Sequence, residues 1–177
     1  MRQMRGNDVT IRAATETDAE AMGRAHVRAW QSAYRGVMPD EYLDELQAHD
    51  RSVMWRSRIL SADLPPLLVA AVSGEVVGFA AFGKERSTEP TERGELYAIN
   101  LDPAQWRRGI GRLLLRHATE ALSAIGYLEA ILWVVPSNQR ARCLYESEGW
   151  TADGVSTTAE ILGVAIDEMR YRKPLIA

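Results

Sequence analysis

Apolar residues recur along the first third of the chain with two periods, that of a strand and that of a helix. Residues 9–13 alternate apolar and polar side chains, which predicts a strand. The threonines and the aspartate of residues 15–18 can cap a following helix. Two more helices are expected, one opened by a proline over residues 39–48 and one over residues 51–60. The helix after residue 18 carries one apolar stripe: Ala21, Met22, Ala25, Ala29, Ala33 and Tyr34.

Strand and helix patterns alternate along the rest of the chain. Two apolar runs, residues 67–72 and 76–82, flank the turn signal Ser73-Gly-Glu and predict a β-hairpin. A polar loop covers residues 85–94, and Gly126 is well placed to end the longest helix. The remaining elements are expected as a strand at 95–101, a helix at 109–126, a strand at 130–135, a helix at 138–148, and strands at 150–154 and 166–173.

This order of elements predicts an α/β (α+β) fold in which helices flank a central mixed sheet. The run of residues 130–135 is almost entirely apolar, as expected of a strand covered on both faces. The chain has no internal repeat, low-complexity tract or convincing linker, and the pair Pro65-Pro66 is interpreted as a loop. Residues 1–177 are therefore expected to form a single domain around one core.

Composition narrows the classes of function. The net charge is −3 and the pI is about 5.7, so the chain lacks the basic excess of a nucleic-acid binder. No apolar run of about 18 residues occurs, which argues against a membrane span. Residues 1–8 lack the apolar core of a signal peptide. Cys143 is the only cysteine, which excludes an internal disulfide and a cysteine-rich metal site. These features favour a cytoplasmic protein.

The segment from residue 96 to residue 115 has the chemistry of an anion site. A predicted strand leads into Trp106-Arg-Arg-Gly-Ile-Gly-Arg, and a predicted helix follows. Glycines let backbone N–H groups approach a ligand closely, and a helix start offers free donors and the positive end of the helix dipole. Phosphate or pyrophosphate is the natural ligand. Four arginines concentrate positive charge there: Arg107, Arg108, Arg112 and Arg116.

Two other phosphate-binding motifs do not fit this segment. No Gly-Lys-Ser/Thr follows, as it would in a P-loop, and the third glycine of the dinucleotide fingerprint is missing after Gly109-Ile-Gly. An arginine-rich helix start whose glycines serve only a turn remains the alternative interpretation.

A second segment, residues 134–150, makes the interpretation specific. Together with the glycine loop it resembles the GNAT superfamily of acetyl-CoA-dependent N-acetyltransferases. That family carries an Arg/Gln-x-x-Gly-x-Gly/Ala loop and, after a further strand, the pattern Asn-x-x-Ala-x-x-x-Tyr-Glu-x-x-Gly-aromatic. Residues 9–18, 69–82 and 168–175 resemble its opening strand and helix, its central hairpin and its last strand. The matching motif positions are Gly109, Gly111, Asn138, Ala141, Tyr145, Glu146, Gly149 and Trp150.

One position departs from the family pattern. Trp106 stands three residues before Gly109, where the family has Arg or Gln. The family's pyrophosphate contacts are largely backbone N–H groups, so the resemblance still implies the site. Gln105 or Arg107 could compensate for the missing side chain.

The resemblance implies a mostly antiparallel sheet with helices on both faces, acetyl-CoA as co-substrate, and no metal. It also implies that backbone groups near Leu101 bind the pantetheine arm. Asn138 matches the family residue that holds this arm, and the alternative role for Asn138 is a helix N-cap. The residues expected to bind the cofactor are Ile99, Asn100, Leu101, Arg107, Arg108, Gly109, Ile110, Gly111, Arg112, Asn138 and Arg142.

Acetyl transfer requires that the amine lose a proton, that the thioester carbonyl be polarised, and that the leaving thiolate be protonated. Tyr145 matches the family position that protonates the thiolate; the alternative is packing. Glu95 begins the strand before the loop, where related enzymes place a base that acts through water; the alternative is an exposed carboxylate at a strand end. Glu95 and Tyr97 share one face of that strand. Cys143 has no evident base, so an acetyl-cysteine intermediate is disfavoured.

The first long helix lies where the family builds its acceptor cleft. His26, Trp30 and Tyr34 follow one another at i, i+4 spacing, and core packing is favoured over substrate contact. Trp30, Tyr34 and Tyr97 are nevertheless retained as candidate acceptor-binding residues. His49 and His117 have no metal-ligand company and are expected on the surface.

The leading hypothesis is an enzyme that acetylates a primary amine by direct transfer. The acceptor is a small molecule or a protein N-terminus, no nucleic acid or membrane is expected as a partner, and a homodimer is left open. The alternative is a non-catalytic acyl-CoA-binding regulatory module, which could dispense with Tyr145 and Glu95. A nucleotide-binding protein is the third hypothesis, but the expected lysine and magnesium-binding hydroxyl are missing.

Overall fold

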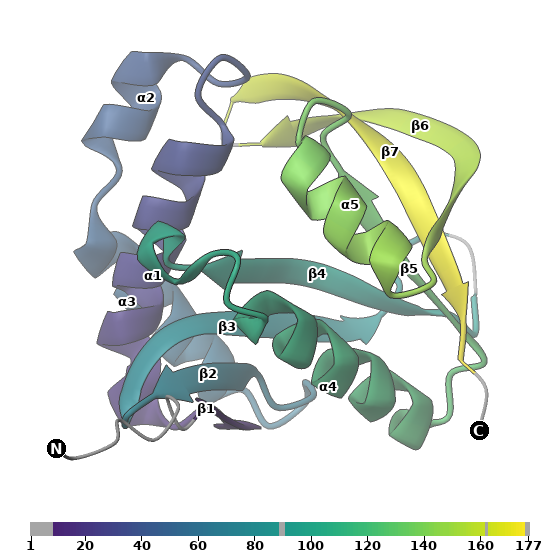
Figure 1. Ribbon diagram of the computed structural model, residues 1–177, viewed down its shortest axis with the longest axis horizontal. Coiled ribbons are helices and arrows are strands. Elements are labelled where there is room, and N and C mark those ends of the chain that lie inside the picture. Colours follow the sequence, from purple (N-terminus) through teal and green to yellow (C-terminus); the bar gives the residue numbers. More distant parts are fainter. Residues whose placement is uncertain (1–8, 89–90, 162, 176–177) are drawn as a thin grey trace, which may run out of the picture.

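A seven-stranded sheet with strand order β1-β2-β3-β4-β5-β7-β6 runs through the part of the chain that the structure describes (Figure 1). The structure is a computed structural model and describes residues 9–88, 91–161 and 163–175; residues 1–8, analysed above for a signal peptide, lie outside it. Neighbouring strands are antiparallel, except that β4 and β5 are parallel. The strands are β1 (Val9–Ala13), β2 (Leu68–Val72), β3 (Glu75–Lys84), β4 (Gly94–Leu101), β5 (Glu129–Val134), β6 (Thr151–Ile161) and β7 (Val164–Pro174).

Helices cover both faces of this sheet. Side chains of β3 alternate between the two faces, so that Phe79 packs with α1 and α3 while Phe82 packs with α4. The predicted fold class, a mixed and mostly antiparallel sheet flanked by helices, is therefore confirmed. The helices are α1 (Ala19–Ala33), α2 (Asp40–Glu45), α3 (Ala48–Ile59), α4 (Ile110–Ile125) and α5 (Gln139–Ser147), with short 3-10 turns η1 (Glu16–Asp18) and η2 (Pro103–Gln105).

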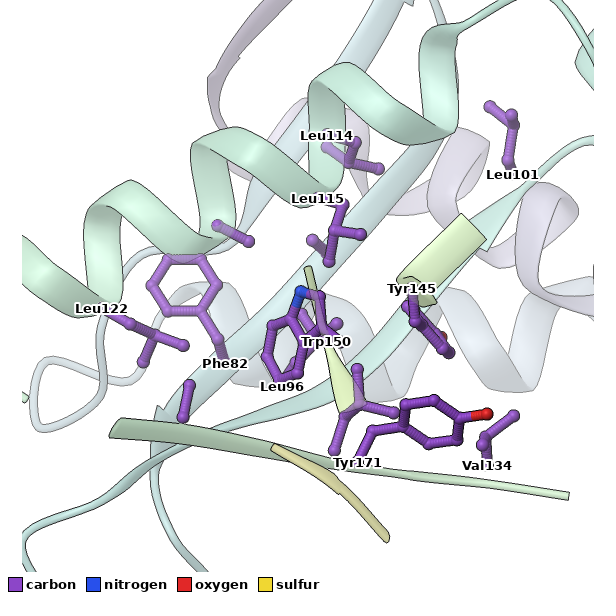
Figure 2. Packing of buried hydrophobic residues seen from close by; sticks show 14 of the residues in the cluster. Phe82, Leu96, Leu101, Leu114, Leu115, Leu122, Val134, Tyr145, Trp150 and Tyr171 are labelled. Atoms are coloured by element: carbon purple, nitrogen blue, oxygen red, sulfur yellow. The ribbon is translucent and has the colours of Figure 1, made fainter. Parts of the chain in front are cut away.

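The apolar stripe of α4 anchors this helix to the sheet. Leu114, Leu115 and Leu122 are fully buried and pack with Phe82 and Trp150 in one cluster, as Figure 2 shows. Truncating a buried leucine of this kind to alanine costs about 2–5 kcal/mol. The start of α4, where the glycine loop lies, is therefore held in a fixed position relative to the strands.

The predicted β2–β3 hairpin is present, but its turn has two residues instead of the expected three, because Glu75 already belongs to β3. Ser73 and Gly74 both have positive φ, 52° and 88°, and Val72 pairs with Glu75. Two consecutive left-handed residues match the twist of the flanking strands, and glycine adopts this conformation without a steric penalty.

Three element boundaries differ from the prediction by three residues or more. Helix α2 ends at Glu45, because Leu46 is extended with ψ of 125°, and α3 begins at Ala48. The strand expected to end near residue 154 continues to Ile161. Its outer half has mostly exposed polar side chains and is stabilised by backbone pairing with β7 past a bulge, so side-chain periodicity did not reveal it.

The β6–β7 hairpin extends past the end of β5. Strand β5 pairs with β7 only as far as Met169, whereas β6 pairs with β7 as far as Val164. Residues 164–168 of β7 therefore have a partner strand on one side only, and this part of the hairpin borders the cavity described below. No helix in the described ranges combines the length and the apolar character needed to cross a membrane.

Candidate active site

The parallel strands β4 and β5 pair over only a short distance. Gly94–Leu96 are in register with Ala130–Leu132, and no further pairs continue the ladder although both strands go on. A cavity of about 760 Å³ lies where they separate, lined by Ile99 of β4 and Trp133 of β5 among others. A volume of this size is typical of sites for small molecules and cofactors.

Both faces of the sheet contribute to this cavity. Trp30 and Tyr34 of α1 line it from one face, and Leu144 and Tyr145 of α5 line it from the other. The gap between β4 and β5 therefore joins the two sides of the sheet, so two molecules that approach from opposite faces could meet within it.

The loop before α4 forms the wall on the α4 and α5 side. Gly109 has a φ of 80° at the N-cap position, Arg107 is also left-handed with a φ of 61°, and no side chain caps the helix. The first-turn N–H groups of α4 are thus free to bind an anion. A Cβ built on Gly111 would meet its nearest atom, on the Leu144 side chain, at 3.6 Å, which is an ordinary van der Waals contact without a clash. Predicted cofactor residues that line the cavity are Ile99, Asn100, Leu101, Arg107, Gly109, Gly111, Arg112 and Asn138.

Trp106, the departure from the family pattern, has two partners. Its Nε1–H donates to the Leu101 carbonyl at 2.9 Å, and the Arg140 guanidinium carbon lies 3.2 Å from the ring centre. Desolvation and the nearby charge of Arg107 lower the pKa of Arg140. Neither Arg107 nor Arg140 has an ion pair with a described residue, so two uncompensated cations line the cavity here. The sequence analysis did not single out Arg140, because α5 brings it over the loop only in the folded chain.

The other predicted cofactor residues have partners of their own. Arg108 donates to the Gln105 side chain at 2.7 Å, and Arg142 donates to the Tyr171 hydroxyl and the Pro136 carbonyl. These arginines do not line the cavity, nor does Ile110, which is 1% exposed in the core. Two lining residues are also engaged: Arg112 pairs with Glu148 at 2.9 Å, and the Asn138 side chain accepts from Ala141 N–H at 3.2 Å as an N-cap.

Tyr145 is buried at the bottom of the cavity. Its ring packs near Trp150 and Tyr171, with ring centres 6.4 and 6.2 Å away, and its hydroxyl forms no hydrogen bond with a described residue. Burial, and secondarily the neighbouring Tyr34, raise the pKa of this phenol, so it keeps its proton at neutral pH. The residue thus combines core packing with a hydroxyl that is free to donate into the cavity.

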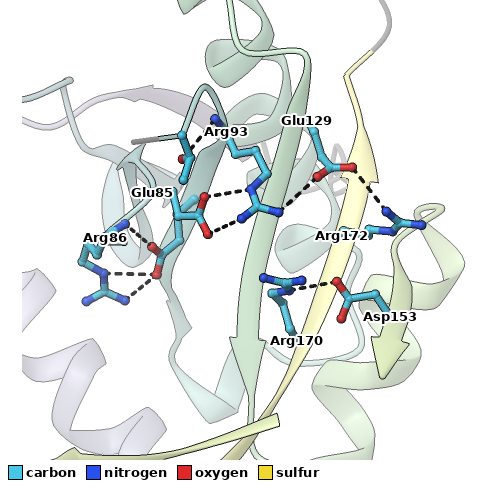
Figure 3. A network of polar contacts seen from close by, with 9 residues as sticks. Glu85, Arg86, Arg93, Glu129, Asp153, Arg170 and Arg172 are labelled. Carbon is cyan, nitrogen blue, oxygen red and sulfur yellow. Dashed lines mark hydrogen bonds and ion pairs between the residues drawn. The ribbon is translucent and has the colours of Figure 1, made fainter. Parts of the chain in front are cut away.

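Glu95 is buried rather than exposed at the strand end. It is 2% exposed and accepts three hydrogen bonds from Arg86: from the backbone N–H at 2.8 Å, from Nε at 3.1 Å and from Nη2 at 2.6 Å. Figure 3 shows Arg86 beside the neighbouring pair of Glu85 and Arg93. Glu95 borders a smaller cavity of about 640 Å³, which shares Arg86 and Trp133 with the larger one.

Tyr97 is the extra residue of a β-bulge in β4, since Ala98 pairs with Ala81 and Leu96 pairs with Phe82. Its hydroxyl donates to the Lys84 carbonyl, and the Arg86 guanidinium lies 4.7 Å from its ring centre. Because Glu95 and Tyr97 both contact Arg86, the two residues lie on the same side of β4, as the period of the strand predicts.

The aromatic stripe of α1 is divided between core and cavity. His26 is 4% exposed, and its Nδ1 accepts a hydrogen bond from Trp55 Nε1–H at 3.0 Å. His26 is therefore a core residue, as the favoured interpretation of the sequence predicts. Trp30 and Tyr34, with ring centres 4.9 Å apart, line the cavity instead. Burial, and then the charge of Glu168, raise the pKa of Tyr34 to about 12. His49 and His117 are exposed, as expected.

Sequence reasoning missed several residues of the cavity wall, among them Arg86, Trp133, Arg140 and Glu168. One signal was available for Glu168. In β7 it lies two residues from Ile166, which is 2% exposed, and alternation in a strand therefore turns Glu168 toward the interior. Within the described residues, no group of His, Cys, Asp or Glu side chains is arranged to hold a metal ion.

Comparison with known proteins identifies the class to which this fold and cavity belong. The model of the acetyltransferase (GNAT) family matches residues 25–150, and the chain belongs to this family. It is an acetyl-CoA-dependent N-acetyltransferase, so the predicted enzyme class and co-substrate are confirmed.

Three relatives illustrate the match. The uncharacterized N-acetyltransferase YuaI of Bacillus subtilis is 35% identical over 130 residues, 73% of each chain. The probable N-acetyltransferase Rv2775 of Mycobacterium tuberculosis is 25% identical over 174 residues, 96% of this chain and 95% of the relative. The N-alpha-acetyltransferase RimI of Mycobacterium tuberculosis is 38% identical over 87 residues, 49% of this chain and 52% of RimI.

Solved structures share the fold. An N-acetyltransferase from Staphylococcus aureus Mu50 superposes with a TM-score of 0.75 at 22% identity, over 96% of this chain and 99% of that chain. The PaiA N-acetyltransferase from Thermoplasma acidophilum, solved in complex with coenzyme A, superposes with a TM-score of 0.70 at 19% identity, over 94% of this chain and 99% of that chain.

Proposed function

We propose that the protein transfers the acetyl group of acetyl-CoA directly to a primary amine. The observation that carries this proposal is the cavity through the gap between β4 and β5, with an anion-binding helix start on one side and an aromatic wall on the other. The first side suits the pyrophosphate of acetyl-CoA, and the second is free for an acceptor. The two substrates would meet in one cavity, so no covalent acetyl-enzyme is required.

The cofactor would be held by three kinds of group. The first-turn N–H groups of α4 would bind the pyrophosphate, and Arg107 and Arg140 would neutralise its charge. Beyond Leu96, the backbone groups of β4 that point toward β5 have no partner strand, so they could bind the pantetheine arm, while those on the other edge stay paired with β3. Arg112 and Asn138 lie on the same wall and complete the proposed cofactor site.

The chemical step would then need two proton transfers. The amine nitrogen attacks the thioester carbonyl carbon, the carbon–sulfur bond breaks, and the amine proton passes through water to Glu95. Tyr145 donates its phenolic proton to the leaving thiolate. Because Arg86 already occupies the Glu95 carboxylate, this water would have to reach Glu95 from the smaller cavity that it borders.

The acceptor would bind near Trp30, Tyr34 and Tyr97. Both small amines and peptide N-termini fit this proposal; the RimI relative is named for acetylation of an alpha-amine. We also propose that the protein acts in the cytoplasm, because Cys143 is an exposed free thiol and such thiols persist in reducing compartments.

A screen of amines with acetyl-CoA tests this function. Release of free thiol should depend on both the enzyme and the amine, and a new N-acetyl product should appear by mass spectrometry. Coenzyme A should raise the melting temperature by mass action, whereas ATP and NAD at equal concentration should do so much less. Acetyl-CoA that binds but is never consumed faster with any amine or N-terminal peptide would overturn the proposal.

A further inference from the structure

One carboxylate on the acceptor side of the cavity has no partner. Glu168 of β7 is half-buried, lines the cavity, and makes no hydrogen bond or ion pair with any described residue. Two other carboxylates of the sheet region are paired. Glu85 binds Arg93 and Asp153 binds Arg170, both at 2.8 Å, as Figure 3 shows.

Arg86 offsets this charge only in part. Three of its N–H groups already donate to Glu95, and the two residues form an ion pair of zero net charge. The carboxylate of an acceptor would therefore meet an Arg86 whose positive charge Glu95 already neutralises, although N–H groups of the guanidinium stay unbonded among the residues that the structure describes. The exposed Glu160 of β6, also without an ion pair in the described chain, adds a second negative charge to the same wall.

Partial burial of Glu168 strengthens its attraction for a cation. Desolvation by burial, and then the nearby Glu95, raise the pKa of Glu168, while Arg86 lowers it. A partly desolvated carboxylate gains more from a cation than an exposed one does, since screening by water is weaker. The negative charge of Glu168 also contributes to the raised pKa of Tyr34, so the two side chains are close to each other.

Aromatic residues make up much of the apolar lining on this side of the cavity. Trp30 and Tyr34 come from α1, and Trp133 comes from the edge of β5 that faces the gap. Aromatic faces attract cations and also bind apolar groups. A ligand with a positive group beside Glu168 and an apolar body between the aromatic rings would match both the carboxylate and the aromatic lining.

We propose that Glu168 binds the ammonium group of the acceptor, and that the acceptor is a cationic amine with an apolar body and no carboxylate beside the amine. This inference rests on the proposed transfer to a primary amine and narrows its substrate. An amino acid would place its carboxylate next to Glu168 and Glu160, with Arg86 already neutralised by Glu95. Such a like-charge approach is unfavourable in a partly dry cavity.

Three matched probes test the selection by charge. Phenethylamine, phenylalanine amide and phenylalanine share one apolar body and differ in carrying hydrogen, a neutral amide or a carboxylate beside the amine. Each is titrated calorimetrically into the enzyme saturated with coenzyme A, so that the measurement does not depend on turnover. Phenethylamine should bind at least about 10-fold tighter than phenylalanine, and the amide should lie closer to phenethylamine.

Two outcomes would overturn the inference. Phenylalanine that binds as tightly as phenethylamine would mean that Arg86 or another cation accepts the carboxylate. An amide that binds as poorly as the acid would mean that bulk, rather than charge, decides. Failure of the proposed function is distinguishable, because it would be seen as amines that bind without ever accepting the acetyl group.

A charge-matched pair of variants tests the residue. Glu168→Gln should weaken phenethylamine binding about 10- to 100-fold, the size expected of a hydrogen bond between charged groups, while coenzyme A affinity stays near wild type. The control is Asp167→Asn, which removes the same charge from the neighbouring exposed residue, where Asp167 accepts a hydrogen bond from Thr158. If both variants lost the same phenethylamine affinity, Glu168 would act only through the overall negative charge of the protein, and its assigned role would be refuted.

Discussion

The guanidinium carbon of Arg140 lies 3.2 Å from the centre of the Trp106 ring. Trp106 stands where the family pattern has Arg or Gln, and α5 supplies the arginine that lies over its ring. The indole contacts the guanidinium at the cavity wall and is itself fixed by its hydrogen bond to the Leu101 carbonyl. We infer that the basic group of the loop comes from α5 in this protein.

Replacing this arginine should weaken cofactor binding. Arg140→Ala removes one of two uncompensated cations at the cavity, so the dissociation constant of coenzyme A should rise about 10- to 100-fold by titration calorimetry. Arg56→Ala is the control, since it removes the same charge from the far helix α3 and should change the constant less than about twofold. Equal effects would show that only the overall charge matters.

Backbone access at the start of α4 should matter more than the helix arginines. A Cβ at Gly111 would meet its nearest protein atom at an ordinary contact distance of 3.6 Å, so Gly111→Val should fold while placing a branched side chain beside the proposed pyrophosphate site. Arg116→Ala removes a side chain that is already paired with Glu148. The valine variant should therefore lose more coenzyme A affinity, and the reverse order would indicate a site built from side-chain charges.

Loss of the Tyr145 hydroxyl should slow turnover without affecting acetyl-CoA affinity. Because a positioned proton donor contributes about 100- to 10,000-fold, Tyr145→Phe should lower kcat by that order while calorimetry gives a nearly unchanged dissociation constant. Tyr171→Phe is the control, since that hydroxyl bonds to Glu146 outside the cavity. Full turnover by Tyr145→Phe would leave packing as the role of this residue.

Glu95→Gln should give a loss that depends on pH. If Glu95 receives the amine proton, the variant should be most impaired at low pH, where the amine is protonated, and should recover toward the pKa of the amine. Tyr145→Phe should show no such recovery, because its hydroxyl acts on the leaving group. A loss that is constant with pH would instead assign Glu95 to holding Arg86, to which it is bonded three times.

His26 should make the protein less stable in mild acid. Burial, and secondarily the charge of Arg51, lower the pKa of His26 from 6.5 to about 3. Between these values the unfolded chain binds a proton that the folded chain excludes, so stability present above pH 6.5 is lost as the pH falls toward 3. From pH 7 to pH 5 the free energy of unfolding should drop by about 2 kcal/mol from this residue alone.

Urea titrations at several pH values measure this effect. His26→Gln keeps an acceptor for Trp55 but cannot be protonated, so it should flatten the pH dependence of the unfolding free energy. The exposed His117→Gln variant should keep the wild-type slope. A His26→Gln protein with the wild-type slope would assign the acid sensitivity to other groups.

Local patterns were sufficient for most elements and for the anion-binding loop. The period of apolar residues and the two positive-φ positions of the β2–β3 turn depend on neighbours along the chain, and so does the left-handed Gly109 before α4. Boundaries were predicted poorly where backbone pairing alone defines an element, as in the exposed half of β6. Side-chain patterns carry no information about such pairing.

The sequence by itself determined the order of elements, the alternation that turns β3 toward two cores, and the glycine loop with its arginines. Tertiary structure alone decided where β4 and β5 separate, because pairing is a property of two segments distant in the chain. It also decided that Arg140 of α5 covers Trp106, that Arg86 occupies Glu95, and that Glu168 of β7 stays unpaired. These contacts join residues from different elements, and only packing of the whole sheet brings their charges within range of one another.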